Sequence, residues 1–110
     1  DKDREYMVAI FLDTRNRVLA VQDVAIGTVD SALITPRELF KAAILLGAVS
    51  LILAHNHPSG DTYPSQNDIQ MTECLVKAGE LLGIKVLDHI IVGDSFISLK
   101  DKGLMDNKTS

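Results

Sequence analysis

The sequence predicts an α/β fold in which a mixed β-sheet is flanked by helices. Short apolar runs of strand length recur along the 110 residues, and two longer segments carry apolar residues at helical spacing between capping residues. Strand-like runs precede the first helical segment, lie between the two, and follow the second. The simplest architecture for this order is one mixed sheet packed against the helices.

A β-hairpin is predicted at the N-terminal end of the chain. Residues 6–12 and 18–25 are apolar-rich runs of strand length, and the polar residues 13–17 between them suit the loop. Gly27 closes the second run. Residues 28–34 have the composition of a further short strand.

The first helix begins at a capping motif. Thr35 suits the N-cap, and Pro36 suits the first helical position, where its missing N–H costs nothing. Glu38 completes a capping box by reaching back to the Thr35 amide. Gly47 can end the helix. The apolar positions at helical spacing are Leu39, Ala42, Ala43 and Leu46.

A buried strand is expected over residues 49–54, and it leads directly into the His-Asn-His run at residues 55–57. A loop rich in Pro, Gly and Asp follows over residues 58–64. The second helix begins at Ser65 and ends at Gly83. Its predicted buried face consists of Met71, Leu75, Ala78 and Leu82.

Two more strands are expected over residues 85–92 and 95–99, with a turn at residues 93–94. The polar tail, residues 100–110, is expected to be frayed. No repeat or shift in composition marks a second domain, so residues 1–110 are interpreted as a single domain. Because the chain starts without Met, we expect it to be the C-terminal part of a longer chain.

Composition excludes several classes of protein. Apolar residues make up 46% of the chain and charged residues 24%, as in an ordinary globular domain. The net charge of −4, without a block of Lys or Arg, argues against a surface that binds nucleic acid. The single cysteine, Cys74, excludes an intrachain disulfide. No apolar run approaches the ~20 residues of a membrane span and no signal peptide is visible, so a cytoplasmic location is expected by elimination.

Three side chains suggest a metal site: His55, His57 and Asp68. In an extended chain the two histidines point to one face, and Pro58 favours extended geometry for the residue before it. The loop then returns the chain to Asp68 in the first turn of the second helix. Two imidazoles and one carboxylate with a fourth position open are the ligands of a catalytic zinc site. Such an ion activates water and polarises a carbonyl group, which is hydrolytic chemistry.

Each of these residues also has an ordinary structural explanation. A His-x-His pair alone is equally consistent with surface or core histidines. Asp68 takes the Glu position of a capping box that begins at Ser65, and helix physics alone favours the cap. The combination favours the metal site, because two histidines end a buried strand and a loop folds back to a carboxylate.

The spacing His55-x-His57, seven residues, Ser65, two residues, Asp68 resembles the metalloprotease motif of the JAMM domain, also called MPN+ or JAB. The run HNHPSGD at residues 55–61, followed by Pro64, is similar to the bacterial RadC family in particular. Further resemblance lies at residues 27–28, 36–38 and 87–93, and the whole extends over residues 6–104.

This resemblance implies a JAMM/MPN-like fold, related to that of cytidine deaminases, and cleavage of amide or isopeptide bonds with Zn²⁺ as cofactor. It implies that His55, His57 and Asp68 bind the zinc, and that Ser65 stabilises the tetrahedral intermediate. In the family a helix–hairpin–helix domain usually precedes this one, and the family's DNA-repair label rests on weak grounds.

The family motif also requires a Glu on the second strand as general base, and Gln22 occupies the position where we expect it. A glutamine amide cannot take a proton from water. Asp23 is an alternative if a β-bulge turns it inward, and Glu38 is the other carboxylate candidate. The sequence therefore supports metal binding more firmly than turnover.

Two further residues with reactive side chains have structural interpretations. His89, within an apolar strand, is interpreted as a core residue, with a place beside the metal site as the alternative. Cys74 on the second helix is interpreted as a buried, inert cysteine and not as a ligand.

Three functions are compatible with the sequence. The first is a zinc-dependent hydrolase that acts on a peptide or protein. The second is a metal-binding but catalytically weak module that recognises a protein or a DNA-associated partner, with Gln22 marking the lost base. The third is a nucleic-acid-binding accessory domain, against which the acidic balance argues. No membrane partner is expected, and the oligomeric state is not fixed by the sequence.

Overall fold

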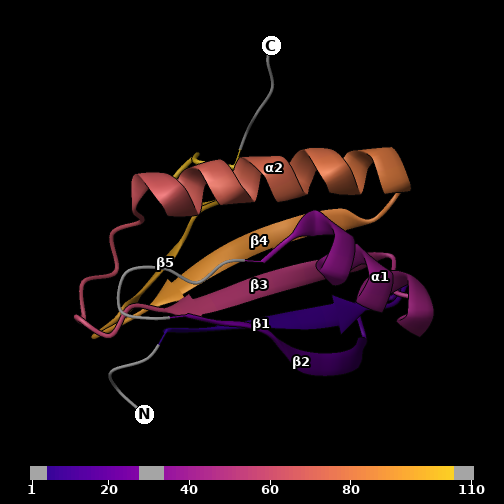
Figure 1. Ribbon diagram of the computed structural model, residues 1–110, viewed down its shortest axis with the longest axis horizontal. Coiled ribbons are helices and arrows are strands. Elements are labelled where there is room, and N and C mark those ends of the chain that lie inside the picture. Colours follow the sequence, from indigo (N-terminus) through magenta and orange to yellow (C-terminus); the bar gives the residue numbers. More distant parts are fainter. Residues whose placement is uncertain (1–4, 28–33, 106–110) are drawn as a thin grey trace.

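A computed structural model of the protein describes residues 5–27 and 34–105 (Figure 1). In these described ranges, two helices lie over a five-stranded mixed sheet, which confirms the predicted fold class. In chain order the elements are β1 (Glu5–Leu12), β2 (Val18–Gly27), α1 (Pro36–Leu46), β3 (Ser50–Asn56), α2 (Gln66–Leu82), β4 (Lys85–Val92) and β5 (Phe96–Ser98).

The sheet has the strand order β2-β1-β3-β4-β5. β3 and β4 run parallel, and every other neighbouring pair is antiparallel. α2 makes the crossover that a parallel pair requires. The carboxyl end of the central strand β3 therefore leads through one loop to the N-terminus of α2 (Figure 1).

The core lies between the two helices and one face of the sheet. Every second residue of β1 from Met7 to Phe11 is fully buried. In the register with β3, Met7 pairs with His55 and Ala9 pairs with Leu53, so these residues share that face. Side chains from both helices belong to the same apolar cluster. His55 therefore stands on the core face of the sheet, at the end of its central strand.

Local signals placed the first helix correctly, and two strands extend beyond their predicted ends. The Glu38 amide donates to Thr35 Oγ1 over 3.2 Å, and Gly47 ends α1 in the left-handed conformation with φ 72°. In the described residues only this half of the predicted capping box is formed, without a bond from the Thr35 amide to the Glu38 side chain. β2 continues to Gly27 and β3 to Asn56. The strand predicted over residues 28–34 falls almost wholly outside the described residues.

Two packing expectations are wrong. The sequence predicts Leu82 on the buried face of α2, but this side chain is 52% exposed, because the buried stripe follows Asp68, Thr72, Leu75 and Gly79. The sequence also predicts a frayed tail from residue 100 on. Instead, Met105 is buried and Leu104 packs against the core, so the chain is anchored at least as far as residue 105.

Gly79→Ala is expected to destabilise the protein. A Cβ at this position would lie 2.2 Å from the backbone oxygen of Ile84 and 3.3 Å from the Phe40 ring. On an exposed helix face, Gly→Ala raises the free energy of unfolding by about 1 kcal/mol. At Gly79, overpacking costs about 1–3 kcal/mol, so the free energy of unfolding is expected to fall. Urea unfolding measures the effect, with Lys77→Ala on the exposed side of α2 as the control. An unchanged free energy of unfolding for Gly79→Ala would show that the contact is not as close as described.

Candidate metal centre

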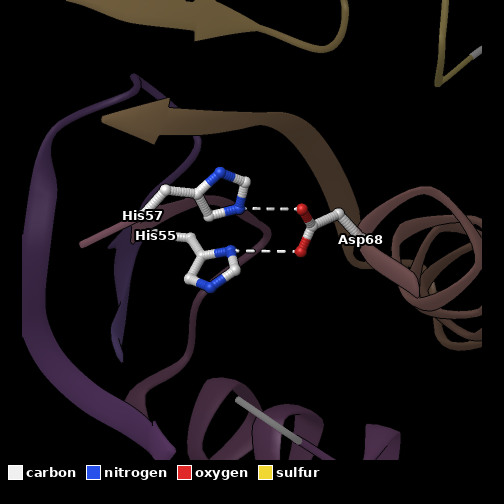
Figure 2. A group of neighbouring side chains, drawn as sticks. All are labelled: His55, His57 and Asp68. Atoms are coloured by element: carbon white, nitrogen blue, oxygen red, sulfur yellow. Dashed lines mark hydrogen bonds and ion pairs between the residues drawn. The ribbon is translucent and has the colours of Figure 1, made fainter. Parts of the chain in front are cut away.

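The two candidate histidines lie side by side at the carboxyl end of β3 (Figure 2). His55 is 3% exposed, and His57 follows directly after the strand. Their ring centroids are 5.1 Å apart and the rings meet edge to face at 85°. The i, i+2 spacing in an extended chain thus brings both imidazoles to the same side.

The loop after β3 is fixed against the turn between β4 and β5. The Asp94 amide donates to the Gly60 carbonyl over 3.0 Å. Gly93 permits this approach, since a Cβ there would lie 2.5 Å from the Gly60 oxygen. Within the loop, His57 Nδ1 lies 2.8 Å from the Asp61 carbonyl oxygen, which can only accept. Nδ1 therefore carries a proton, and the other ring nitrogen, Nε2, faces Asp68 Oδ2 over 3.0 Å.

Asp68 both caps α2 and faces the two histidines, which are the two roles that the sequence leaves open. Its Oδ2 accepts a hydrogen bond from the Ser65 amide over 2.9 Å, and Ser65 Oγ accepts one from the Asp68 amide over 3.0 Å. These two bonds form the predicted capping box of α2. The same Oδ2 lies 3.0 Å from His57 Nε2, and Oδ1 lies 3.3 Å from His55 Nδ1. The cap therefore aims the carboxylate at the two imidazoles, as Figure 2 shows.

The Asp68 carboxyl group is held in its ionised form. Burial by itself would raise the pKa of Asp68. The hydrogen bonds with Ser65 and the nearby imidazoles of His55 and His57 outweigh burial and lower the pKa below the ordinary 3.8. A charged oxygen therefore faces the histidines at neutral pH.

The three side chains fit a bound cation. His55 presents one ring nitrogen to each of two carboxylates: Nε2 lies 3.0 Å from Glu5 Oε1, and Nδ1 lies 3.3 Å from Asp68 Oδ1. Nδ1 is buried and has no hydrogen-bond partner in the part of the chain that is described. A cation bound here could take a lone pair from each imidazole and balance the charge of the Asp68 carboxylate. The ligand atoms of the three residues lie within 4.8 Å of one another, and two nitrogens with one oxygen suit a divalent metal ion.

Glu5, the first residue of β1, is a neighbour of the site that the sequence did not reveal. It is 8% exposed and shares the core face with Met7, the pairing partner of His55. This register brings its carboxylate to the His55 ring. Glu5 is one of several charged residues at the start of the chain, which in the sequence resemble an exposed segment. The available signal was the alternation of Glu5, Met7 and Ala9, which puts a carboxylate on the buried face.

The structure does not bring Gln22 to the metal centre. β2 is an edge strand separated from β3 by β1, so roughly 10 Å of sheet lies between β2 and the histidines. Gln22 pairs with Ala9, two residues along β1 from the residue that pairs with His55. Its side chain is exposed. The sequence therefore assigns the general base to the wrong strand. Gln22 belongs to the edge strand β2, which is not adjacent to the strand that carries His55.

Asp23 and Glu38 are both exposed, and neither belongs to the group of close ligand atoms formed by His55, His57 and Asp68. The pairing of β2 with β1 carries two register shifts, one between Val18 and Ala20 and one between Asp23 and Ala25. Asp23 itself pairs with Val8, on the opposite face of the sheet from Met7. The side chain of Asp23 is exposed. Glu38 lies on the exposed side of α1. Asp23 therefore does not take the inward position that a β-bulge would give it, and the exposed Glu38 is not part of the group of close ligand atoms.

Ser65 lies beside the cluster as the N-cap of α2. In the described residues its hydroxyl oxygen accepts a hydrogen bond from the Asp68 amide, so the hydroxyl proton stays available for donation. The residue is exposed, which leaves this donor accessible to a molecule that enters the site.

His89 is both a core residue and a neighbour of the cluster. It is fully buried, and its ring centroid lies 5.7 Å from that of His55. Burial, together with the nearby His55, lowers the pKa of His89 to about 4, so the ring is neutral at neutral pH. Cys74, expected to be buried, is exposed on α2.

Among the described residues, neither helix has the length and the apolar character that crossing a membrane would need.

Comparison with known proteins gives consistent matches. A model described as the RadC-like JAB domain matches residues 1–104. A UPF0758 protein of Desulforamulus reducens is 57% identical over 106 residues, which cover 96% of this chain and 47% of the relative. A UPF0758 protein of Desulforudis audaxviator is 59% identical over 103 residues, covering 93% and 45%. One from Methanosarcina acetivorans is 47% identical over 106 residues, covering 96% and 46%. The chain spans about half the length of these curated relatives.

Proposed function

The chain belongs to the RadC-like JAB domain family, and we propose on this premise that it is a zinc-dependent hydrolase of amide or isopeptide bonds. The observation that carries the proposal is the convergence of His55, His57 and Asp68 within 4.8 Å. The similarity to JAMM metalloproteases supplies the reaction class. Zinc is the proposed metal, because two imidazoles and one carboxylate leave a position open for water.

Bound zinc would lower the pKa of its water toward ~7 and polarise a substrate carbonyl. The residues of the chain provide the remaining steps. Glu5 contacts His55 through Oε1, and its carboxylate is the group that would take the proton that water loses as it attacks. We therefore assign the general base to Glu5 in place of Gln22. This assignment removes the reason for interpreting the domain as a weak module that has lost its base.

The proposed substrate is a peptide or protein in the cytoplasm, bound by this one domain without nucleic acid or membrane. The net charge of −4 supports the exclusion of nucleic acid, since a duplex-binding face needs clustered Lys and Arg. The decisive experiment incubates the zinc-loaded protein with a library of internally quenched peptides and isopeptide-linked pairs. Cleavage that exceeds that of a His55→Ala/His57→Ala variant is expected. Equal cleavage by both proteins would refute the proposed activity.

Ser65→Ala is expected to lower kcat by about 10²–10³-fold, the cost of losing one donor to an oxyanion. The same change removes the N-cap of α2 and costs about 1 kcal/mol of stability. Thr35→Ala is the matched control, because it removes the cap of α1, which is not part of the metal centre. Both variants should lose similar stability and only Ser65→Ala should lose activity. A Ser65→Ala enzyme with full kcat would exclude Ser65 from the reaction.

A further inference from the structure

We propose that His89 and Thr72 are positioning residues that hold Asp68 at the metal centre. Both are fully buried, His89 in β4 and Thr72 in α2, one helical turn after Asp68. Thr72 Oγ1 donates to the Asp68 carbonyl over 2.7 Å, and His89 Nδ1 lies 2.6 Å from the same Oγ1. This chain of hydrogen bonds ties the strand to the helical turn that carries the proposed ligand.

The direction of the two hydrogen bonds follows from their partners. A carbonyl oxygen can only accept, so the single hydroxyl proton of Thr72 goes to Asp68. Thr72 Oγ1 must then accept from His89, which places the proton of the neutral ring on Nδ1. Thr72 and His89 each donate one hydrogen bond in this network, so the Thr72 hydroxyl has no freedom to rotate.

The first turns of α2 depend on this link because they bury little apolar surface. Over residues 66–72 the only buried side chains are Asp68 and Thr72, whereas Ile69 and Met71 are partly exposed. The first buried apolar side chain of the helix is Leu75. Met71 packs against the core while only partly buried, and the bond between His89 and Thr72 adds a direct polar link from β4 to the start of α2.

A direct role for His89 as a fourth metal ligand is the alternative. Its Nε2 is buried and has no hydrogen-bond partner within the described ranges, and its ring lies near that of His55. However, the group of mutually close ligand atoms found there consists of His55, His57 and Asp68 without His89. A fourth protein ligand would also close the position that water needs. The geometry therefore favours positioning over ligation.

The test uses Thr72→Val, which keeps the shape of the side chain and removes the hydroxyl. We expect zinc to bind about 10–100-fold more weakly, as when an outer partner of a ligand is lost. Bound Co²⁺ should show an altered visible absorption spectrum. Thr72→Ser restores the hydroxyl and should restore both affinity and spectrum. His89→Leu removes the other partner and should weaken zinc binding to a similar extent, whereas His89→Gln keeps an N–H donor and should recover part of it.

The control is Leu75→Ala, which removes a fully buried side chain one turn nearer the middle of the same helix. It should lower stability yet leave the zinc affinity and the Co²⁺ spectrum of the folded protein unchanged. Because this inference rests on the proposed metal site, wild-type binding is measured first, and failure of the wild type to bind zinc overturns both. Wild-type affinity in Thr72→Val and His89→Leu overturns the positioning role alone. An equal loss in Leu75→Ala also overturns it, since general loosening would then explain the effect.

Discussion

Glu5→Gln is expected to lower kcat by about 10²–10⁴-fold, the usual contribution of a general base, while zinc stays bound. The amide oxygen of Gln can still accept the hydrogen bond from His55 Nε2, so the imidazole keeps its orientation. The amide cannot take a proton from water. Steady-state kinetics of the zinc-loaded variant on a cleaved peptide, together with its metal content, measure the two effects separately.

The matched controls for Glu5→Gln are Gln22→Glu and Asp23→Asn, on the exposed edge strand β2. Neither change should alter kcat more than about two-fold, since surface substitutions away from a site usually have small effects. If Gln22→Glu increases the activity, or if Glu5→Gln retains most of it, the assignment of the base to Glu5 is wrong.

Asp68→Asn is expected to weaken zinc binding by more than the 10–100-fold that loss of an outer-shell partner costs, because a charged ligand atom is removed. Asn can still accept from the Ser65 amide, so the start of α2 stays capped. Zinc at a thousand times the wild-type Kd should add about 4 kcal/mol to the free energy of unfolding of the wild type. The same zinc concentration should add about 1.4 kcal/mol or less to that of Asp68→Asn.

Urea unfolding with and without zinc measures this difference. Ser65→Ala serves as the comparison, because it loses the other half of the capping box while Asp68 remains. It should be less stable without zinc but gain nearly as much from zinc as the wild type. An equal zinc-induced gain in Asp68→Asn and the wild type would show that Asp68 only caps the helix.

Features that depend on neighbouring residues were predictable from the sequence. The pairing of Ser65 with Asp68 as a capping box and the left-handed Gly47 and Gly83 follow from local backbone chemistry. The i, i+2 spacing of the histidines predicted that they face the same way. The loop length and the helix start then brought Asp68 back to them.

Features that depend on contacts between distant segments were not predictable in this way. The position of Glu5 beside His55 requires the register of β1 against β3, which joins residues 50 positions apart. The prediction of the general base at Gln22 is wrong for the same reason. The position of a residue along its own strand does not reveal that another strand, β1, lies between it and the histidines. The wrong prediction for Leu82 also depends on distant contacts. Helical periodicity predicts which residues share one face of α2, but it does not predict where that face stops contacting the core.

The most direct test of the central claim is the zinc content of the protein after saturation with zinc and removal of loosely held metal by gel filtration. Wild-type protein should retain about one zinc per chain, as one site of two nitrogens and an oxygen implies. The His55→Ala/His57→Ala variant should retain none. Equal zinc in both proteins, or a folded wild type that retains none, would contradict the assignment of His55, His57 and Asp68 as a metal centre.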